Sequence, residues 1–193
     1  MKYDGFVEIV GEDAYWFIFL SAATSKDAEV YKYNTICYIL VEPREDGDFT
    51  GVATDGHTLH IVDPLPDVIV EEHGIVEGSY LTLKSEPGRI CLAHCAEKLS
   101  FPNWKAVVPR SDPKFKTTFQ GFSRDFTDRT QMGSRSYLEL SMSFPEKTLI
   151  DMKYLTALSL DLTWEVSWYG PDKPVIFRYD KCTAVIMTNT WWK

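Results

Sequence analysis

Short segments in which apolar and polar residues alternate limit the folds open to this chain more than any other feature of its sequence. This two-residue period is that of half-buried β-strands. Turn pairs such as Asp46-Gly47, Asp55-Gly56, Pro87-Gly88 and Gly170-Pro171 separate the segments. The stretches expected to be strands are residues 5–10, 35–42, 49–55, 57–63, 79–85, 89–95, 136–144, 163–170, 174–180 and 183–190. The sequence therefore predicts a sheet-rich protein.

Two other segments have the features of helices. Residues 12–26 start with two acidic residues and end at Lys26, charges that complement a helix dipole. Residues 145–160 start with a proline, which is favoured in the first turn of a helix. Within them, apolar residues recur at helical spacing and form one face: Leu149, Met152, Leu155 (or Tyr154) and Leu158.

The order strand, helix, strands occurs twice, in residues 5–63 and again in residues 136–190. Two such repeats predict an α+β fold with both helices on one face of the sheets. A length of 193 residues and an apolar content of 45% are enough for a well-packed core. We therefore expect a single domain over residues 1–193, in which residues 64–135 connect the two repeats.

The later part of this connection is basic. Residues 98–135 hold eight basic and three acidic residues, in a chain whose net charge is −8. Phenylalanines are interleaved with the basic residues, at Phe115, Phe119, Phe122 and Phe126. Basic residues mixed with aromatic ones can indicate a nucleic-acid surface. They can equally belong to a long loop that its phenylalanines pin to the core, and we favour this second interpretation.

The overall composition argues against several classes of protein. An acidic chain is unsuited to simple coating of nucleic acid or of an anionic membrane. The longest apolar run, Ala14 to Leu20, is far too short to span a membrane, and the first residues have no signal-peptide pattern. We expect a cytoplasmic protein without a membrane partner, whose four cysteines are thiols.

A zinc site is the alternative reading of one cysteine cluster. Cys91, His94 and Cys95 lie close together in the sequence, as zinc ligands often do. No second pair of ligands with zinc-like spacing accompanies them. We therefore favour buried thiols in a strand or at its edge, and we expect neither a metal nor another cofactor.

The stretch GVATDGHTLHIVD, residues 51–63, brings Asp55, His57 and His60 together. These residue types could form a metal site or an acid–base pair. However, Asp-Gly between alternating strands is a strong hairpin signal, and we expect a type I′ turn. Beyond such a turn, His57 and His60 point to opposite faces of a strand. The sequence also contains no phosphate-binding loop, nucleophile elbow or HExxH motif, so we expect no catalytic residues and no enzyme.

Four segments of the sequence resemble parts of a known protein family. They are VATDGHTL (52–59), LSFPNWKAVVP (99–109), DMKYLTALSLD (151–161) and PVIFRYDKCTAVIMTNT (174–190). In the same order, they resemble a hairpin, a domain-joining segment, a helix and the C-terminal strands of the bacterial DNA sliding clamp, the DNA polymerase III beta subunit. The resemblance implies a clamp-like domain, in which two helices face the central hole of a ring.

The resemblance also implies a function without catalysis, in DNA replication or repair. Clamps act as processivity factors and bind short hydrophobic peptides of polymerases and other partner proteins. By motif position, the peptide-binding pocket would use Thr54, His57, Leu59, Pro109, Val185 and Met187. An alternative remains open, because Leu59, Val185 and Met187 could be plain sheet core.

The chain also departs from the clamp pattern. A clamp has three domains and about twice this length, and it has an arginine where this chain has Thr58. A ring around double-stranded DNA would therefore need several copies of this chain, as a homo-oligomer. The segments expected to be helices are not basic, although clamp helices meet phosphates through lysine and arginine. Weak candidates for DNA contacts are Lys26, Lys147, Lys153, Lys114, Lys116 and Arg124.

These departures leave two functions open. The first is an oligomeric processivity or scaffold factor that binds peptide motifs. The second is an interaction module, or a clamp decoy, that has kept the fold but no longer encircles DNA.

Overall fold

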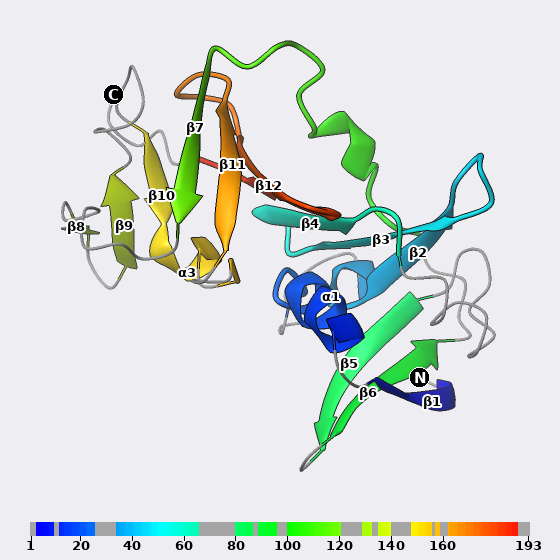
Figure 1. Cartoon of the computed structure of the whole chain (residues 1–193). Coiled ribbons are helices and arrows are strands. Elements are labelled where there is room, and N and C mark those ends of the chain that lie inside the picture. Colours follow the sequence, from blue (N-terminus) through cyan, green and yellow to red (C-terminus); the bar gives the residue numbers. More distant parts are fainter. Residues whose placement is uncertain are drawn as a thin grey trace. The chain divides into compact units, whose positions relative to one another are not determined.

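The computed structural model of this chain describes residues 3–9, 12–25, 34–65, 80–86, 89–95, 100–120, 129–132, 135–139, 148–155, 157–158 and 162–188. Internal contacts divide the chain into two compact units, Met1–Pro102 and Asn103–Lys193. Figure 1 labels their helices and strands. The division splits the connecting segment, because its first strands join the first unit and its last strands join the second.

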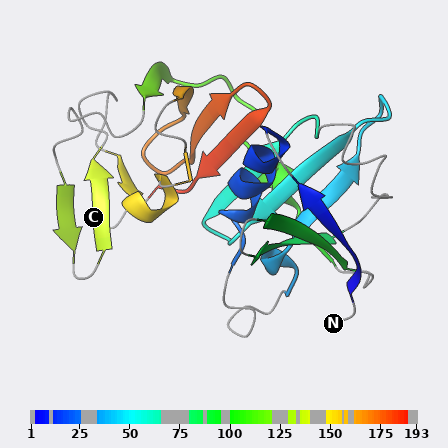
Figure 2. The ribbon, with the colours of Figure 1, turned by 60° about the horizontal axis from the view of Figure 1, so that its bottom comes forward.

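The first unit contains one antiparallel sheet with the strand order β1-β6-β5-β2-β3-β4. Figure 2 shows β1, in dark blue, beside β6 at one edge of this sheet. Its elements are β1 (Tyr3–Ile9), α1 (Glu12–Ser21), the 3₁₀ helix η1 (Asn34–Cys37), β2 (Ile39–Pro43), β3 (Phe49–Thr54), β4 (Thr58–Val62), β5 (Tyr80–Glu86) and β6 (Arg89–Cys95).

Helix α1 packs on β3, β4 and β5 (Figure 1). Its residues Phe17 and Leu20 are fully buried. Gly51 of β3 makes the close approach possible, since a Cβ atom there would lie 2.7 Å from Leu20 Cδ1 and 2.9 Å from Leu65 Cδ2. A residue without a side chain at this point therefore sets how closely helix and sheet pack.

The second unit contains a four-stranded antiparallel segment, β13-β12-β11-β7, and a separate three-stranded sheet, β10-β9-β8. Its elements are the 3₁₀ helix η2 (Trp104–Ala106), β7 (Phe115–Gln120), β8 (Arg129–Met132), β9 (Arg135–Glu139), β10 (Leu149–Asp151), α3 (Met152–Leu155), β11 (Thr163–Trp168), β12 (Val175–Tyr179) and β13 (Cys182–Ile186).

Aromatic side chains form the core of this unit. Trp164 and Trp168 of β11 are buried and lie on the same strand face. The indole Nε1 of Trp168 donates a hydrogen bond of 2.9 Å to the buried hydroxyl of Thr148, which directly precedes β10. Across the sheet, the rings of Phe119 and Phe177 meet edge to face at 5.6 Å. A buried indole with a hydrogen-bond partner is a stable arrangement.

The predicted strands and the first helix are confirmed, with ends shifted by a few residues. Strand, helix and strands recur as β1-α1-β2-β3-β4 and as β9-β10-α3-β11-β12-β13. The segment 35–42 starts with the 3₁₀ helix η1 before it becomes strand β2. The C-terminal part of segment 136–144 lies outside the described residues.

The predicted extent of the second helix was wrong. Residues 149–151 pair with β9 as strand β10, and helix α3 has only four residues. Thr148, Leu149 and Ile150 are all buried, and a short, continuous apolar run does not distinguish a helix from a buried strand. Helix α3 starts where Asp151 Oδ1 accepts a hydrogen bond of 3.1 Å from Lys153 N, as in an N-cap.

The interpretation of the later connection as a long loop was also wrong. Residues 115–120 form β7, which pairs with β11, and residues 129–132 form β8. The expectation that phenylalanines hold this segment to the core is confirmed for Phe119, which is buried. Phe122 and Phe126 lie outside the described residues. That the two units act as a single domain stays a prediction.

Candidate functional site

The hairpin between β3 and β4 is held by the side chain of Asp55. Its Oδ1 accepts hydrogen bonds from His57 N at 2.8 Å and Thr58 N at 2.7 Å, and lies 3.2 Å from the Thr58 hydroxyl, which donates a third. The hydroxyl of Thr54 accepts from Gly56 N and donates to the carbonyl of Thr58. The turn is thus fixed from within, as in an Asx-turn.

The prediction of a type I′ turn is wrong. Gly56 has a positive φ of 86°, as the Asp-Gly signal implied. A type I′ turn needs two neighbouring residues with positive φ. Among the described residues, Asp180 is the only non-glycine residue with positive φ, so Asp55 does not meet this requirement. The carboxylate of Asp55 takes over contacts that the backbone makes in a type I′ turn.

The two histidines have separate environments, as expected. His57 is exposed at the turn, whereas His60 is only 1% exposed. The His60 ring stacks on Phe19 of α1 with centroids 4.3 Å apart, and its Nδ1 lies 2.6 Å from the carbonyl oxygen of Phe19. Because a carbonyl only accepts hydrogen bonds, Nδ1 must carry the proton.

Burial lowers the pKa of His60 to about 4, and the hydrogen bond to Phe19 and the charge of Asp55 only partly offset this effect. His60 is therefore neutral near pH 7 and holds α1 on β4. The described part of the chain contains no group of three histidine, cysteine or acidic residues that could hold a metal ion. The hairpin histidines thus do not converge on one ligand.

The cysteine cluster lies in strand β6 (Arg89–Cys95), as favoured. In an extended strand, positions 91 and 95 alternate with position 94 onto opposite faces. This backbone arrangement does not bring the three residues of the zinc alternative together on one face.

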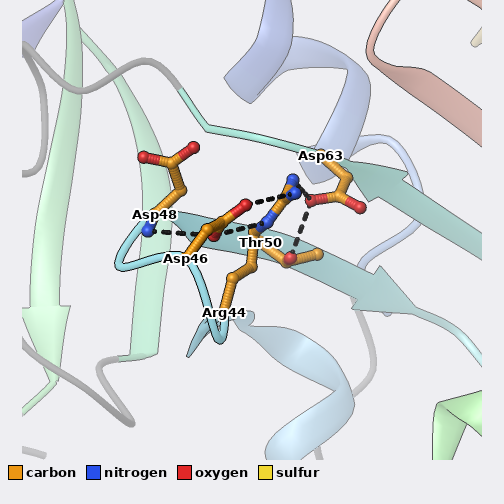
Figure 3. A network of polar contacts seen from close by, with 5 residues as sticks. All are labelled: Arg44, Asp46, Asp48, Thr50 and Asp63. Atoms are coloured by element: carbon orange, nitrogen blue, oxygen red, sulfur yellow. Dashed lines mark hydrogen bonds and ion pairs between the residues drawn. The ribbon is translucent and has the colours of Figure 1, made fainter.

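At the other end of the hairpin, an ionic network joins the β2–β3 turn to the end of β4 (Figure 3). The guanidinium of Arg44 lies between the carboxylates of Asp46, at 2.7 Å, and Asp63. The Thr50 hydroxyl donates to Asp63 at 3.0 Å, and Asp48 N donates to Asp46 at 3.3 Å. These groups are partly exposed, so the network orients the hairpin more than it stabilises the fold.

Sequence reasoning did not single out this network. The turn pair Asp46-Gly47 was recognised, and Gly47 does have a positive φ of 96°. Arg44 and Asp63 are far apart in sequence, however, and only the register of the hairpin brings them together.

Thr54 and Leu59, two of the predicted pocket residues, form a cross-strand pair in the first unit. Their positions alternate with those of Gly51 and His60, which contact α1, so the pair lies on the opposite face of the sheet. Leu59 is buried and Thr54 is half-buried. His57, beside them, is exposed.

The second unit holds three more of the predicted pocket residues. Val185 pairs with Ile176 across β12 and β13 and is 1% exposed. Met187, two residues further on, is 44% exposed. The hydroxyl of Thr188 donates towards the carbonyls of Pro171, at 2.8 Å, and Lys173, at 3.1 Å, which holds the chain beyond Met187. Pro109 follows η2 and is half-buried.

Each unit therefore contributes three of the six residues. The structure pairs Thr54 with Leu59 within the first unit. In the second unit, Val185 lies in β13 and Met187 follows directly after the end of this strand. That all six line one pocket stays a prediction.

Of the weak candidates for DNA contacts, Lys114, Lys116 and Lys153 are exposed. The ammonium of Lys153 lies 4.3 Å from the ring centroid of Tyr154, a cation–π contact. Lys26, Arg124 and Lys147 lie outside the described residues. Helix α1 contains two acidic residues and no lysine or arginine, so its surface has no electrostatic attraction for phosphate.

No protein-family model and no curated protein sequence matches this chain. Solved structures do match it over nearly its whole length. The DNA polymerase III beta subunit of Caulobacter crescentus has a TM-score of 0.58 at 17% identity, over 98% of this chain and 68% of its own. The beta subunit of Borrelia burgdorferi, in complex with a natural product, has a TM-score of 0.56 at 14% identity, over 98% and 65%.

A third similar structure is the beta clamp of Helicobacter pylori bound to a DNA ligase peptide. It has a TM-score of 0.55 at 9% identity, over 98% of this chain and 66% of its own. This chain thus spans about two thirds of the length of these proteins. In the described part of the chain, no helix has the length and apolar character needed to cross a membrane.

Proposed function

We propose that this chain, whose fold is that of the bacterial DNA sliding clamps, is a non-enzymatic scaffold that binds short peptide motifs of replication or repair proteins. The observation that carries the proposal is the structural match over 98% of the chain to a clamp that holds a DNA ligase peptide. The described residues of the β3–β4 hairpin and of the end of β13 also support it.

The hairpin supports the proposal through its rigidity. Side-chain hydrogen bonds fix the Asp55 turn, and the ionic network around Arg44 fixes the opposite end. The exposed His57 is therefore presented at a defined place beside Thr54 and Leu59. A preorganised surface binds a flexible peptide at a lower entropic cost than a mobile one does.

The second unit supports it through an exposed apolar side chain. Met187 is 44% exposed at the end of a strand whose preceding residues, Val185 and Ile186, are buried. Methionine adapts its shape to different apolar partners and is frequent on binding surfaces. Apolar walls with a few polar groups suit the capture of a short hydrophobic peptide from a DNA polymerase or another replication protein.

The test uses a fluorescein-labelled copy of the DNA ligase peptide from the Helicobacter pylori complex. Binding to the full chain is followed by fluorescence anisotropy. We expect saturable binding that Met187→Asp weakens by about tenfold or more, because the substitution places a charge in an apolar contact.

Ile18→Asp is the matched control. Ile18 lies on α1 and is 46% exposed, close to the exposure of Met187, but it is not a pocket residue. Its substitution adds the same charge and should leave the affinity unchanged. Equal binding by the wild type and Met187→Asp, or no saturable binding at all, would contradict the proposal.

A processivity role requires more than peptide binding. Because the chain spans about two thirds of a clamp chain, we propose that it would encircle double-stranded DNA only as a homo-oligomer. Analytical ultracentrifugation at micromolar concentration tests the oligomer. Titration with a labelled DNA duplex at 50 and 200 mM salt tests for the salt-sensitive binding expected of phosphate contacts.

A clamp-fold interaction module that does not encircle DNA is the second candidate. The specific observation in its favour is that α1 carries two acidic residues and no basic one. A monomer without salt-sensitive DNA binding, but with intact peptide binding, would establish this second function. That the protein acts in the cytoplasm stays a prediction.

A further inference from the structure

The last hairpin of the second unit carries two sulfur atoms in very different surroundings. Cys182, at the start of β13, is fully buried, and Met187, just after its end, is 44% exposed. Burial, with a smaller effect of Asp180, raises the pKa of the Cys182 thiol. Since the thiolate is the reactive form of cysteine, this thiol is protected from oxidants. The accessible sulfur of the hairpin is the thioether of Met187.

Met187 is exposed at the end of a strand whose backbone is held on both sides of it. The backbone just before it pairs with β12 through Val185 and Ile186. Just after it, the Thr188 hydroxyl donates towards the carbonyls of Pro171 and Lys173. The thioether therefore stands on a fixed backbone and is open to small molecules in solution.

We propose that Met187 is an oxidation site through which a hydroperoxide switches off peptide binding. The regulatory half of this inference rests on the proposed function, because it assumes that Met187 contacts the peptide. The thioether sulfur attacks the terminal peroxide oxygen, an S–O bond forms and the O–O bond breaks. Sulfur loses two electrons and becomes the sulfoxide, while the peroxide is reduced to water or an alcohol.

Oxidation changes the character of the binding surface. A sulfoxide is polar and accepts hydrogen bonds, so covering it with an apolar peptide side chain costs desolvation. The reaction is reversible, since methionine sulfoxide reductases return both sulfoxide epimers to the thioether. The surface beside Val185 thus has a reduced state that binds the peptide and an oxidised, reducible state that does not.

The experiment treats the full chain with hydrogen peroxide and samples it over time. Peptide mapping by mass spectrometry gives the oxidised fraction of each of the five methionines. Anisotropy with the labelled ligase peptide gives the ratio of Kd after treatment to Kd before treatment. We expect Met187 sulfoxide to accumulate at close to the rate of free methionine, and the Kd ratio to rise about tenfold or more.

Two variants distinguish the effect of oxidising Met187 from the effect of oxidising other sulfur atoms. Met187→Leu has no thioether, so its Kd ratio should stay near one, whatever its starting affinity. Cys37→Ser removes a half-buried thiol of the first unit, and it should keep the full sensitivity of the wild type. Treatment with methionine sulfoxide reductases should restore the untreated Kd of the wild type.

The outcomes distinguish the two parts of the inference. If Met187 is oxidised much more slowly than free methionine, the oxidation site is refuted, whether or not the peptide binds. If it is oxidised but the wild type and Met187→Leu show the same Kd ratio, the switch is refuted and the proposed function stands. If the untreated protein binds no peptide, the proposed function and the switch both fail, and the oxidation rate alone decides the site.

Discussion

Asp55 is the residue on which the geometry of the hairpin turn depends. Three donors, two backbone amides and the Thr58 hydroxyl, share its Oδ1. We expect Asp55→Ala to lower the free energy of unfolding by about 1–3 kcal/mol, because the amide of the buried Thr58 would lose its acceptor. Asp55→Asn keeps an acceptor oxygen and should cost clearly less. Urea unfolding of both variants checks this, and equal losses would contradict it.

His60 gives a prediction for the dependence of stability on pH. Its pKa in the folded chain is about 4, below the ordinary value of 6.5. As pH falls below 6.5, the unfolded chain binds a proton that the folded chain does not, so stability is lost between about pH 6.5 and pH 4. At pH 5 this one group should cost about 2 kcal/mol relative to pH 7.5.

The measurement compares the wild type with His60→Leu, which has no titrating group at this position. Urea unfolding at pH 7.5 and pH 5.0 gives the change in stability of each protein. We expect the change to be about 2 kcal/mol larger in the wild type. The same change in both proteins would mean that other groups cause the acid sensitivity.

At the residue scale, the alternation of side chains along a strand predicted more of the structure than the sequence signal for the turn did. The opposite environments of His57 and His60 follow from the two-residue period of a strand, which the sequence shows directly. The turn type could not be predicted in this way, because it depends on hydrogen bonds that the Asp55 side chain makes in three dimensions.

At the scale of elements, Gly51 controls the packing of α1 on the sheet. A Cβ atom there would meet Leu20 Cδ1 at 2.7 Å and Leu65 Cδ2 at 2.9 Å. We expect Gly51→Ala to cost about 1–3 kcal/mol of unfolding free energy, because a methyl group would overfill a packed interface. Thermal or urea unfolding measures this loss.

A double-mutant cycle identifies the cause of that loss. Leu20→Ala removes the side chain that the new methyl group would meet, at the cost of a cavity. The loss in the double variant should be clearly smaller than the sum of the two single losses. Additive losses would show that the cost of Gly51→Ala does not arise from contact with Leu20.

The elements themselves were predictable where one face of a strand is polar. The exposed Thr163 and Glu165 of β11 alternate with the buried Trp164 and Val166, and the predicted segment, residues 163–170, contains the whole strand. The run at residues 148–151 is buried at every position, so it carries no alternation that could have distinguished a strand from a helix.

At the scale of the whole molecule, the number of unfolding transitions distinguishes a single domain from two separate units. Five of the six tryptophans lie in residues 103–193, so tryptophan fluorescence reports mainly the second unit. Gly51→Ala acts in the first unit. If the units unfold separately, we expect this variant to leave the fluorescence midpoint in urea unchanged while the circular dichroism transition broadens or moves.

A fluorescence midpoint that moves in parallel with the circular dichroism transition would instead show that residues 1–193 unfold as one domain. Thr148→Val is the matched substitution in the second unit, because it removes the hydroxyl that Trp168 contacts. It should move the fluorescence midpoint in either case, which confirms that the probe responds.

Sequence segments predicted the clamp fold because they preserve the order of its strands and turns. They could not predict which residues contact a peptide, because a short segment predicts only local geometry, such as the pairing of Thr54 with Leu59. Three of the six predicted peptide-binding residues lie in each unit. Contacts with a peptide are therefore measured with the peptide bound.

Photo-crosslinking tests the predicted peptide-binding residues most directly. The ligase peptide is made with a benzophenone in place of one apolar residue, irradiated with the full chain and mapped by mass spectrometry. We expect the crosslinks to fall on Met187 and on residues 54–59 of the hairpin, which contain predicted peptide-binding residues of each unit. Crosslinks located away from both segments would contradict the account that this clamp fold binds peptides through these residues.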